Sequence, residues 1–144
     1  MKLLSSNLSD SSDLPKEYTC DGKGTSPNFF WSDFPSETKS FAFIMEDPDA
    51  PAGTYIHWLA INMPLSITSI KEGFTTISEA EMISNTSGKV DYVPPCPPTG
   101  SHSYIFKVFA LSIEKIDRVN KDNFYEKIKP YVLDQTEIRS KYKR

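Results

Sequence analysis

The sequence is short of the features that mark several large classes of protein. It has 144 residues with only two cysteines, and Cys20 and Cys96 have no spacing typical of a metal site. The longest strongly apolar run, Phe41–Met45, is far shorter than a membrane span. The N-terminal stretch Met1–Ser5 becomes polar too soon for the apolar region of a signal peptide. We therefore expect a cytoplasmic protein that is not integral to a membrane.

Excess charge is also lacking. Sixteen basic and nineteen acidic residues give a formal net charge of −3, so no strong positive field attracts nucleic acid or an acidic membrane. One basic cluster lies at the C-terminus, and a charged chain end is usually solvated. We expect no nucleic-acid partner. The members of this cluster are Arg139, Lys141, Lys143 and Arg144.

Apolar and aromatic residues are plentiful, and they are arranged in short runs. Hydrophobic residues make up 38% of the chain, which is enough to bury the core of one domain spanning residues 1–144. Eleven prolines and six glycines separate runs of aromatic and β-branched residues, as in antiparallel sheets. Three runs are apolar on both faces except at Lys107, which predicts central strands covered on both sides. These runs are Ser40–Glu46, Tyr55–Asn62 and Tyr104–Leu111.

The last quarter of the chain changes its period. Large and apolar residues recur there at helical spacings, and Asp122 stands before them as a candidate N-cap. Pro130 removes an amide within this pattern, which predicts a kink or two short helices that meet there. The pattern comprises Phe124, Ile128, Tyr131, Val132, Gln135, Ile138 and Tyr142.

Chemically capable side chains gather beside the three predicted strands. Asp47 and Asp49 follow the first strand in a DPDAP turn, and His57 lies in the second next to Trp58. A proline-rich loop, residues 92–100, leads into the third. Prolines hold such loops in one shape, and a rigid loop at a strand end is a usual place for a binding site.

These groups suit an anion. Two imidazoles can complement it, and an aspartate can orient one of them. A tyrosine hydroxyl adds a donor, and an aromatic ring adds an apolar wall. The groups concerned are His57, His102, Asp47 and Tyr92, with Trp58 or Tyr104 as the wall.

Each signal also has a plainer interpretation. Asp47 and Asp49 can act as turn-forming residues, since Asp before Pro bonds its own backbone. His57 can be a hydrogen-bonded core histidine, and His102 can simply end a loop. The proline run can be a polyproline recognition segment, although it is short and lies between strands.

Taken together, the motifs resemble those of the phosphatidylethanolamine-binding proteins, and in particular their prokaryotic Raf-kinase-inhibitor-like branch. The similarity rests on DPDAP at Asp47–Pro51, on His57-Trp58 and on the PCPP-x-G-x-H-x-Y run from Pro95 to Tyr104. It extends over nearly the whole chain, including Tyr18–Gly22 and the closing Tyr142–Arg144.

The resemblance implies a mainly β fold, with a large antiparallel sheet packed on a smaller one and short C-terminal helices. It also implies a small cavity for phosphate, a phosphorylated headgroup or a carboxylate, with Asp49 at the rim and Trp58 packed behind. No cofactor or metal is implied, and relatives in the prokaryotic branch are often dimers, so a homodimer is an open expectation. The cavity would be lined by Asp47, His57, Tyr92, Pro97, Pro98, His102 and Tyr104.

One departure from the branch concerns the mouth of the cavity. Ser103 stands where the branch usually has Arg, so a cation near the mouth is missing. Cys20 and Cys96 lie in loops that approach the cavity in this family, and free thiols are the expectation, with a disulfide as the alternative. A nucleophilic Cys96 paired with His102 lacks an orienting third group.

Three functions remain open. The first is a non-enzymatic binding protein that takes a small anionic ligand and modulates a protein partner such as a kinase or protease. The second is a kinase or serine-protease inhibitor acting through its surface. The third is a hydrolase or metalloenzyme, for which Asp47, His57 and His102 have suitable ligand types but no close spacing.

Overall fold

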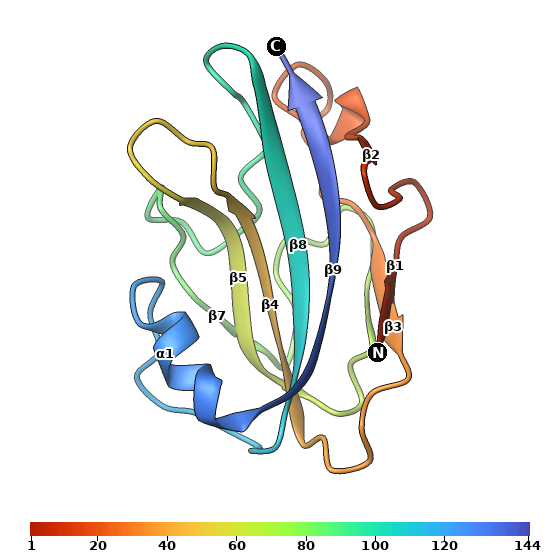
Figure 1. Cartoon of the computed structure of the whole chain (residues 1–144), viewed down its shortest axis with the longest axis vertical. Coiled ribbons are helices and arrows are strands. Elements are labelled where there is room, and N and C mark those ends of the chain that lie inside the picture. Colours follow the sequence, from red (N-terminus) through yellow and green to blue (C-terminus); the bar gives the residue numbers. More distant parts are fainter.

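The structure, a computed structural model that describes all residues 1–144, consists of two packed β-sheets with one short α-helix and two 3₁₀ turns (Figure 1). The large sheet has the strand order β2-β9-β8-β4-β5-β7 and the small sheet the order β1-β3-β6. All pairings are antiparallel except that of β2 with β9. The strands are β1 (Lys2–Leu4), β2 (Ser12–Asp13), β3 (Phe29–Ser32), β4 (Ser40–Asp47), β5 (Tyr55–Pro64), β6 (Ser69–Ile70), β7 (Glu81–Met82), β8 (Ser101–Leu111) and β9 (Val132–Lys143).

The three predicted central strands are confirmed. They form β4, β5 and β8, and every residue of β4 is buried. The apolar character of both faces has a simple cause, because a hydrophobic cluster lies on each side of the large sheet. The exception noted in the sequence, Lys107, forms an ion pair with Glu46 at 2.7 Å.

The larger cluster fills the space between the two sheets, where Trp31 and Phe29 of β3 meet Phe41 and Phe43 of β4. The smaller cluster lies on the opposite face of the large sheet and is covered by the segment around the helix. Burial of this apolar surface on both faces is the main favourable contribution to the fold. The smaller cluster includes Ala42, Ile44, Leu59, Ile61, Phe109, Leu111, Phe124 and Ile128.

The predicted helical pattern at the C-terminus is correct only for its first part. An α-helix, α1 (Phe124–Ile128), meets a 3₁₀ turn, η2 (Lys129–Tyr131), so two short helices meet beside Pro130 as expected. Asn123, not Asp122, directly precedes α1.

From Val132 onward the helical prediction is wrong, because the chain forms the long strand β9. Odd-numbered residues of β9 are exposed, and even-numbered ones are buried or partly buried. This is the period of two expected for a strand. The prediction failed because several inward positions, such as Asp134, Thr136 and Ser140, carry polar side chains, which conceals the alternation in the sequence.

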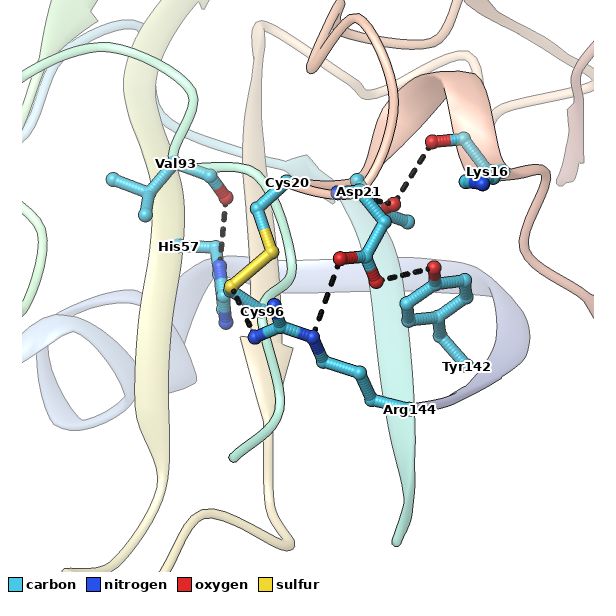
Figure 2. Close-up of a disulfide and its surroundings, with 9 residues drawn as sticks. Lys16, Cys20, Asp21, His57, Val93, Cys96, Tyr142 and Arg144 are labelled. Carbon is cyan, nitrogen blue, oxygen red and sulfur yellow. Dashed lines mark hydrogen bonds and ion pairs between the residues drawn. A yellow bond between two sulfur atoms is a disulfide. The ribbon is translucent and has the colours of Figure 1, made fainter. Parts of the chain in front are cut away.

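Cys20 and Cys96 form a disulfide, so the expectation of free thiols is wrong (Figure 2). Their Cα atoms are 5.4 Å apart although 76 positions separate them in the sequence. A backbone hydrogen bond of 3.0 Å from the Cys20 amide to the Pro95 carbonyl holds the same two loops together. The loop after η1 (Lys16–Tyr18) is thereby tied to the proline-rich loop.

No helix of the protein has the length and apolar character needed to cross a membrane.

Candidate functional site

A small cavity lies where β4 ends and where β5 and β8 begin. Its volume is about 240 Å³. Six of the nine residues singled out from the sequence lie around it, including both imidazoles, so the required juxtaposition is present. Whether these residues bind a ligand stays a prediction. The cavity is lined by Asp47, Ala50, Pro51, Tyr55, His57, Val93, Pro94, Cys96, Pro97, Pro98, His102 and Tyr104.

Asp47 and His102 form a buried pair on one wall of the cavity. The Nδ1 atom of His102 lies 2.6 Å from Oδ2 of Asp47. Because a carboxylate only accepts, this geometry places the Nδ1 proton on His102 and leaves its Nε2 atom without a partner in the protein. The other oxygen of Asp47 accepts the Asp49 amide at 2.8 Å. Asp47 therefore has both proposed roles, since it shapes the turn and orients an imidazole.

Asp49 lies outside the cavity and is exposed. Its carboxylate accepts a 2.7 Å hydrogen bond from the backbone amide of Ser103. This bond fastens the turn after β4 to the beginning of β8, next to His102. The rim position expected from the family resemblance agrees with this arrangement.

His57 also lines the cavity, and its hydrogen bonding differs from that of His102. Its Nδ1 atom donates to the Val93 carbonyl oxygen at 2.8 Å (Figure 2). Burial lowers the pKa of His57, which favours the neutral ring. A neutral ring with its proton on Nδ1 has a free lone pair on Nε2. In this neutral state His57 offers one donor and one acceptor, so it cannot donate through both nitrogens.

A β-bulge positions His57 and Trp58. The register between β4 and β5 shifts at this point, because Met45 pairs with Trp58 whereas Glu46 pairs with Ile56. Ile56 belongs to the cluster beneath the helix and Trp58 to the cluster between the sheets. His57 is the extra residue between them, and the bulge turns its side chain toward the cavity, as bulges beside functional sites often do.

Trp58 packs behind the cavity, as the family resemblance implied. Its indole nitrogen donates to the Thr75 carbonyl oxygen at 2.8 Å. The ring contacts Phe43 and Tyr92 edge-on, with centroid distances of 5.0 and 5.3 Å. Trp58 is fully buried and is not among the lining residues, so it supports the site from the core.

Tyr92 does not line the cavity, which corrects the prediction that its hydroxyl is a donor there. The side chain is buried, and its hydroxyl donates to the Tyr18 carbonyl oxygen at 2.7 Å. The other predicted tyrosine, Tyr104, does line the cavity, and its ring centroid lies 5.4 Å from that of His57. Burial raises the pKa of Tyr104, so its hydroxyl stays protonated and able to donate.

Several site residues were missed from the sequence. Tyr55 lines the cavity with its ring 4.7 Å from that of His57, and its place two positions before His57 was a usable signal. Asn85 and Thr86 brace the bulge from outside. The Thr86 hydroxyl accepts the Ile56 amide at 2.8 Å, and the Asn85 side chain donates to the His57 carbonyl oxygen at 3.2 Å.

Arg144 provides a cation near the proline-rich loop, although Ser103 does not. Its Nη1 atom lies 3.1 Å from the sulfur of Cys96, and its Nε atom lies 3.2 Å from Asp21 (Figure 2). The Tyr142 hydroxyl donates to the same carboxylate at 2.7 Å. Arg144 is therefore already paired, and its positive charge is largely offset by Asp21.

A larger, open depression of about 810 Å³ lies at the other end of the large sheet. Lysine and glutamate side chains dominate its lining, and no histidine or aromatic residue faces it. We regard the smaller cavity as the candidate site, because it holds the chain's only two histidines and the Asp47–His102 pair.

The fold and the cavity define a two-sheet protein of the phosphatidylethanolamine-binding class. The sequence profile described as phosphatidylethanolamine-binding protein matches residues 4–143. The chain belongs to this family.

Curated relatives and solved structures agree with this assignment. A UPF0098 protein of Aquifex aeolicus is 40% identical, with all of this chain and 89% of the relative covered. The UPF0098 protein YbhB of Escherichia coli is 38% identical over 81% of this chain and 82% of its own length. The crystal structure of the phosphatidylethanolamine-binding-protein homologue CT736 of Chlamydia trachomatis has 35% identity and a TM-score of 0.89, with 99% and 96% coverage. The crystal structure of E. coli YbcL, described as a new member of the mammalian phosphatidylethanolamine-binding family, has 28% identity and a TM-score of 0.91, with 99% and 98% coverage.

Proposed function

We propose that this protein is a non-enzymatic binding protein whose cavity takes a small anionic group, such as phosphate, a phosphorylated headgroup or a carboxylate. The observation that supports this most is the convergence of His102, His57 and Tyr104 on one cavity. Its volume of about 240 Å³ suits a headgroup with a few waters, each of which occupies about 30 Å³ in the liquid. Acyl chains of a phospholipid would have to remain outside.

His102 supplies the main attraction for an anion in this proposal. Asp47 fixes the ring with Nε2 free, and in the charged ring this nitrogen donates. The Tyr104 hydroxyl offers a second donor. Because the walls are prolines and a disulfide-tied loop, the site changes shape little on binding, which lowers the entropic cost.

An NMR titration with phosphate and with phosphoethanolamine tests the proposal. The chain has only two histidines and both line the cavity, so every imidazole signal reports on the site. We expect both sets to shift at millimolar ligand. Unchanged signals with either ligand at that concentration would refute anion binding.

Modulation of a protein partner is part of the same proposal. A phosphorylated side chain of a kinase or protease has the same anionic group as a headgroup, and the cavity opens to exposed loop residues such as Pro98 and Thr99. If the cavity mediates this role, His102→Phe should abolish both ligand binding and inhibition. Inhibition that survives this substitution would favour the alternative of a surface-acting inhibitor.

The absence of catalysis is likewise a proposal. The sulfur of Cys96 is bonded to Cys20, so no thiolate is available beside His102 in this state. No three His, Cys, Asp or Glu side chains come close enough to hold a metal ion, which leaves the metalloenzyme alternative without structural support. Turnover of phosphate or carboxylate esters that His102→Phe removes would contradict this part of the proposal.

A cytoplasmic location remains a prediction, and the disulfide limits it. Disulfides persist in oxidising compartments and in the cytosol of hyperthermophiles, whereas most cytosols keep thiols reduced. Alkylation of thiols in intact cells, followed by mass spectrometry of Cys20 and Cys96, tests the point. Labelled, reduced cysteines would indicate a reducing cytoplasm, and an intact disulfide an oxidising environment.

A further inference from the structure

We infer that the cavity prefers oxyanions that still carry a proton, such as hydrogen phosphate or a phosphomonoester monoanion, over oxyanions without one. The inference rests on the proposed function and specifies its ligand. It follows from the hydrogen-bonding direction of His57, from the charges around the cavity and from the fixed positions of both imidazoles.

The first step is the tautomer of His57. The Val93 carbonyl oxygen, 2.8 Å from Nδ1, can only accept, so Nδ1 carries a proton. Burial lowers the pKa of His57 overall, although the nearby charge of Asp47 acts in the opposite direction, so a second proton on the ring is disfavoured. The Nε2 atom of His57 is therefore an acceptor, and no group of the protein donates to it. Within the cavity, water or the hydroxyl of a bound ligand can supply this donor, and an oxyanion without a proton that displaces the water cannot.

The second step concerns charge. Asp47 is the only carboxylate that lines the cavity, and His102 can offset its charge at most once. His57 contributes no charge, while the nearby Asp49 is a further carboxylate. Arg144, the nearest guanidinium to the loop, is already paired with Asp21. The cavity thus has no surplus positive charge to neutralise a fully deprotonated dianion.

A proton-bearing oxyanion satisfies both walls at once. Its hydroxyl donates to Nε2 of His57, and its other oxygens accept from the Tyr104 hydroxyl and, when the His102 ring carries a proton on both nitrogens, from Nε2 of His102. Sulfate has the same tetrahedral shape but no proton, so one of its oxygens would face the His57 lone pair. An unmet buried acceptor is costly enough to change affinity about tenfold or more.

Competition between phosphate and sulfate tests the inference at about pH 7, where inorganic phosphate still carries at least one proton. The histidine signals report binding, and ionic strength is held constant. We expect phosphate to bind at least about tenfold more tightly than sulfate. Methyl phosphate should likewise bind better than dimethyl phosphate near pH 6, where about half of the monoester carries a proton and the diester has none.

Three results are distinguishable. Equal affinity for phosphate and sulfate would overturn the inference while leaving anion binding intact. Binding of neither ion would refute the proposed function, and the inference with it. A strong preference for phosphate in both pairs of ligands would support the inference.

His57→Gln supplies the variant, because its amide can turn either an oxygen or an NH₂ group toward the ligand. In this variant the ratio of phosphate affinity to sulfate affinity should fall toward one. Tyr92→Phe is the matched control, since Tyr92 lies next to the site but outside the cavity, and its ratio should not change. If His57→Gln fails to fold, ¹⁵N shifts of the unaltered protein decide, because an Nε2-protonated His57 would contradict the inference.

Discussion

Replacing Cys20 and Cys96 by serine should lower the free energy of unfolding without changing the fold. The disulfide closes a loop with a sequence separation of 76 residues. In the chain-entropy description, removing a cross-link that closes a loop of this length gives the unfolded chain more conformational freedom, which lowers the free energy of unfolding by roughly 4.5 kcal/mol. Typical domains have only about 5–15 kcal/mol in total, so the expected loss is a large share.

The native contacts around the disulfide explain why the fold should survive. The Cys20 amide still donates to the Pro95 carbonyl oxygen, and the Tyr92 hydroxyl still donates to the Tyr18 carbonyl oxygen. Both cysteines are exposed, so little packing is lost with the sulfurs. The effect should therefore come mainly from the greater freedom of the unfolded chain.

Urea denaturation of the wild type and of the double-serine variant, each with and without a dithiol reductant, measures this effect. We expect a lower midpoint for the variant and a steeper dependence on urea, since its unfolded chain exposes more surface. Reductant should bring the wild type to the variant's curve and leave the variant unchanged. A loss below about 1 kcal/mol in the variant would refute the entropic reasoning.

Three further predictions concern single side chains. Burial lowers the pKa of His57 in the folded state, so as the pH falls below about 6.5 the unfolded chain takes up a proton on this residue before the folded protein does. The contribution of His57 to stability is therefore present above that pH and is lost below it. In urea denaturation at pH 7 and pH 5, His57→Gln should reduce this loss of stability. Tyr92→Phe removes the 2.7 Å hydrogen bond to the Tyr18 carbonyl oxygen, which should lower the free energy of unfolding by about 1 kcal/mol in the same assay. Phosphate affinity should not change. A loss of affinity would show that Tyr92 takes part in ligand binding. Lys107→Met leaves the buried Glu46 carboxylate without its 2.7 Å ion-pair partner. Because the Lys107 side chain is 22% exposed, we expect thermal unfolding to show a loss of stability of about 2 kcal/mol, which is below the cost of breaking a fully buried pair.

The central strands could be predicted because their signal is local. Ser40–Glu46, Tyr55–Asn62 and Tyr104–Leu111 are apolar on both faces, and β4, β5 and β8 are each covered by a cluster on either side. The strand β9 lacks this signal, because polar residues such as Ser140 occupy its inward positions. Its pairing with β8 along nearly its full length decides its structure, and such long-range pairing cannot be read from periodicity.

The disulfide and the direction of Tyr92 depended on distances that the sequence does not contain. Thiol pairing requires two Cα atoms to approach within about 7 Å, and only the folded loops bring Cys20 and Cys96 to 5.4 Å. Tyr92 is one residue from Val93, which does line the cavity. In an irregular loop, neighbouring side chains follow no fixed alternation, so the sequence favoured Tyr92 on its chemistry alone.

The bulge in β5 connects the core to the cavity. In a regular strand, neighbouring residues point to opposite faces, so with Trp58 in the core between the sheets, His57 would point toward the helix. The register shift opposite Met45 and Glu46 removes this constraint, so that His57 faces the cavity while Trp58 packs on Phe43.

The bulge also explains the hydrogen-bonding direction of the site. Displaced from the regular ladder, His57 meets the Val93 carbonyl oxygen of the proline-rich loop, and the Val93 amide in turn donates to the His57 carbonyl oxygen at 3.2 Å. The loop therefore continues the pairing of β5 and fixes the proton on Nδ1. The Nε2 acceptor of His57, which we propose selects for protonated ligands, is thus a consequence of the backbone register. Any change that restores regular pairing in β5 should remove His57 from the cavity.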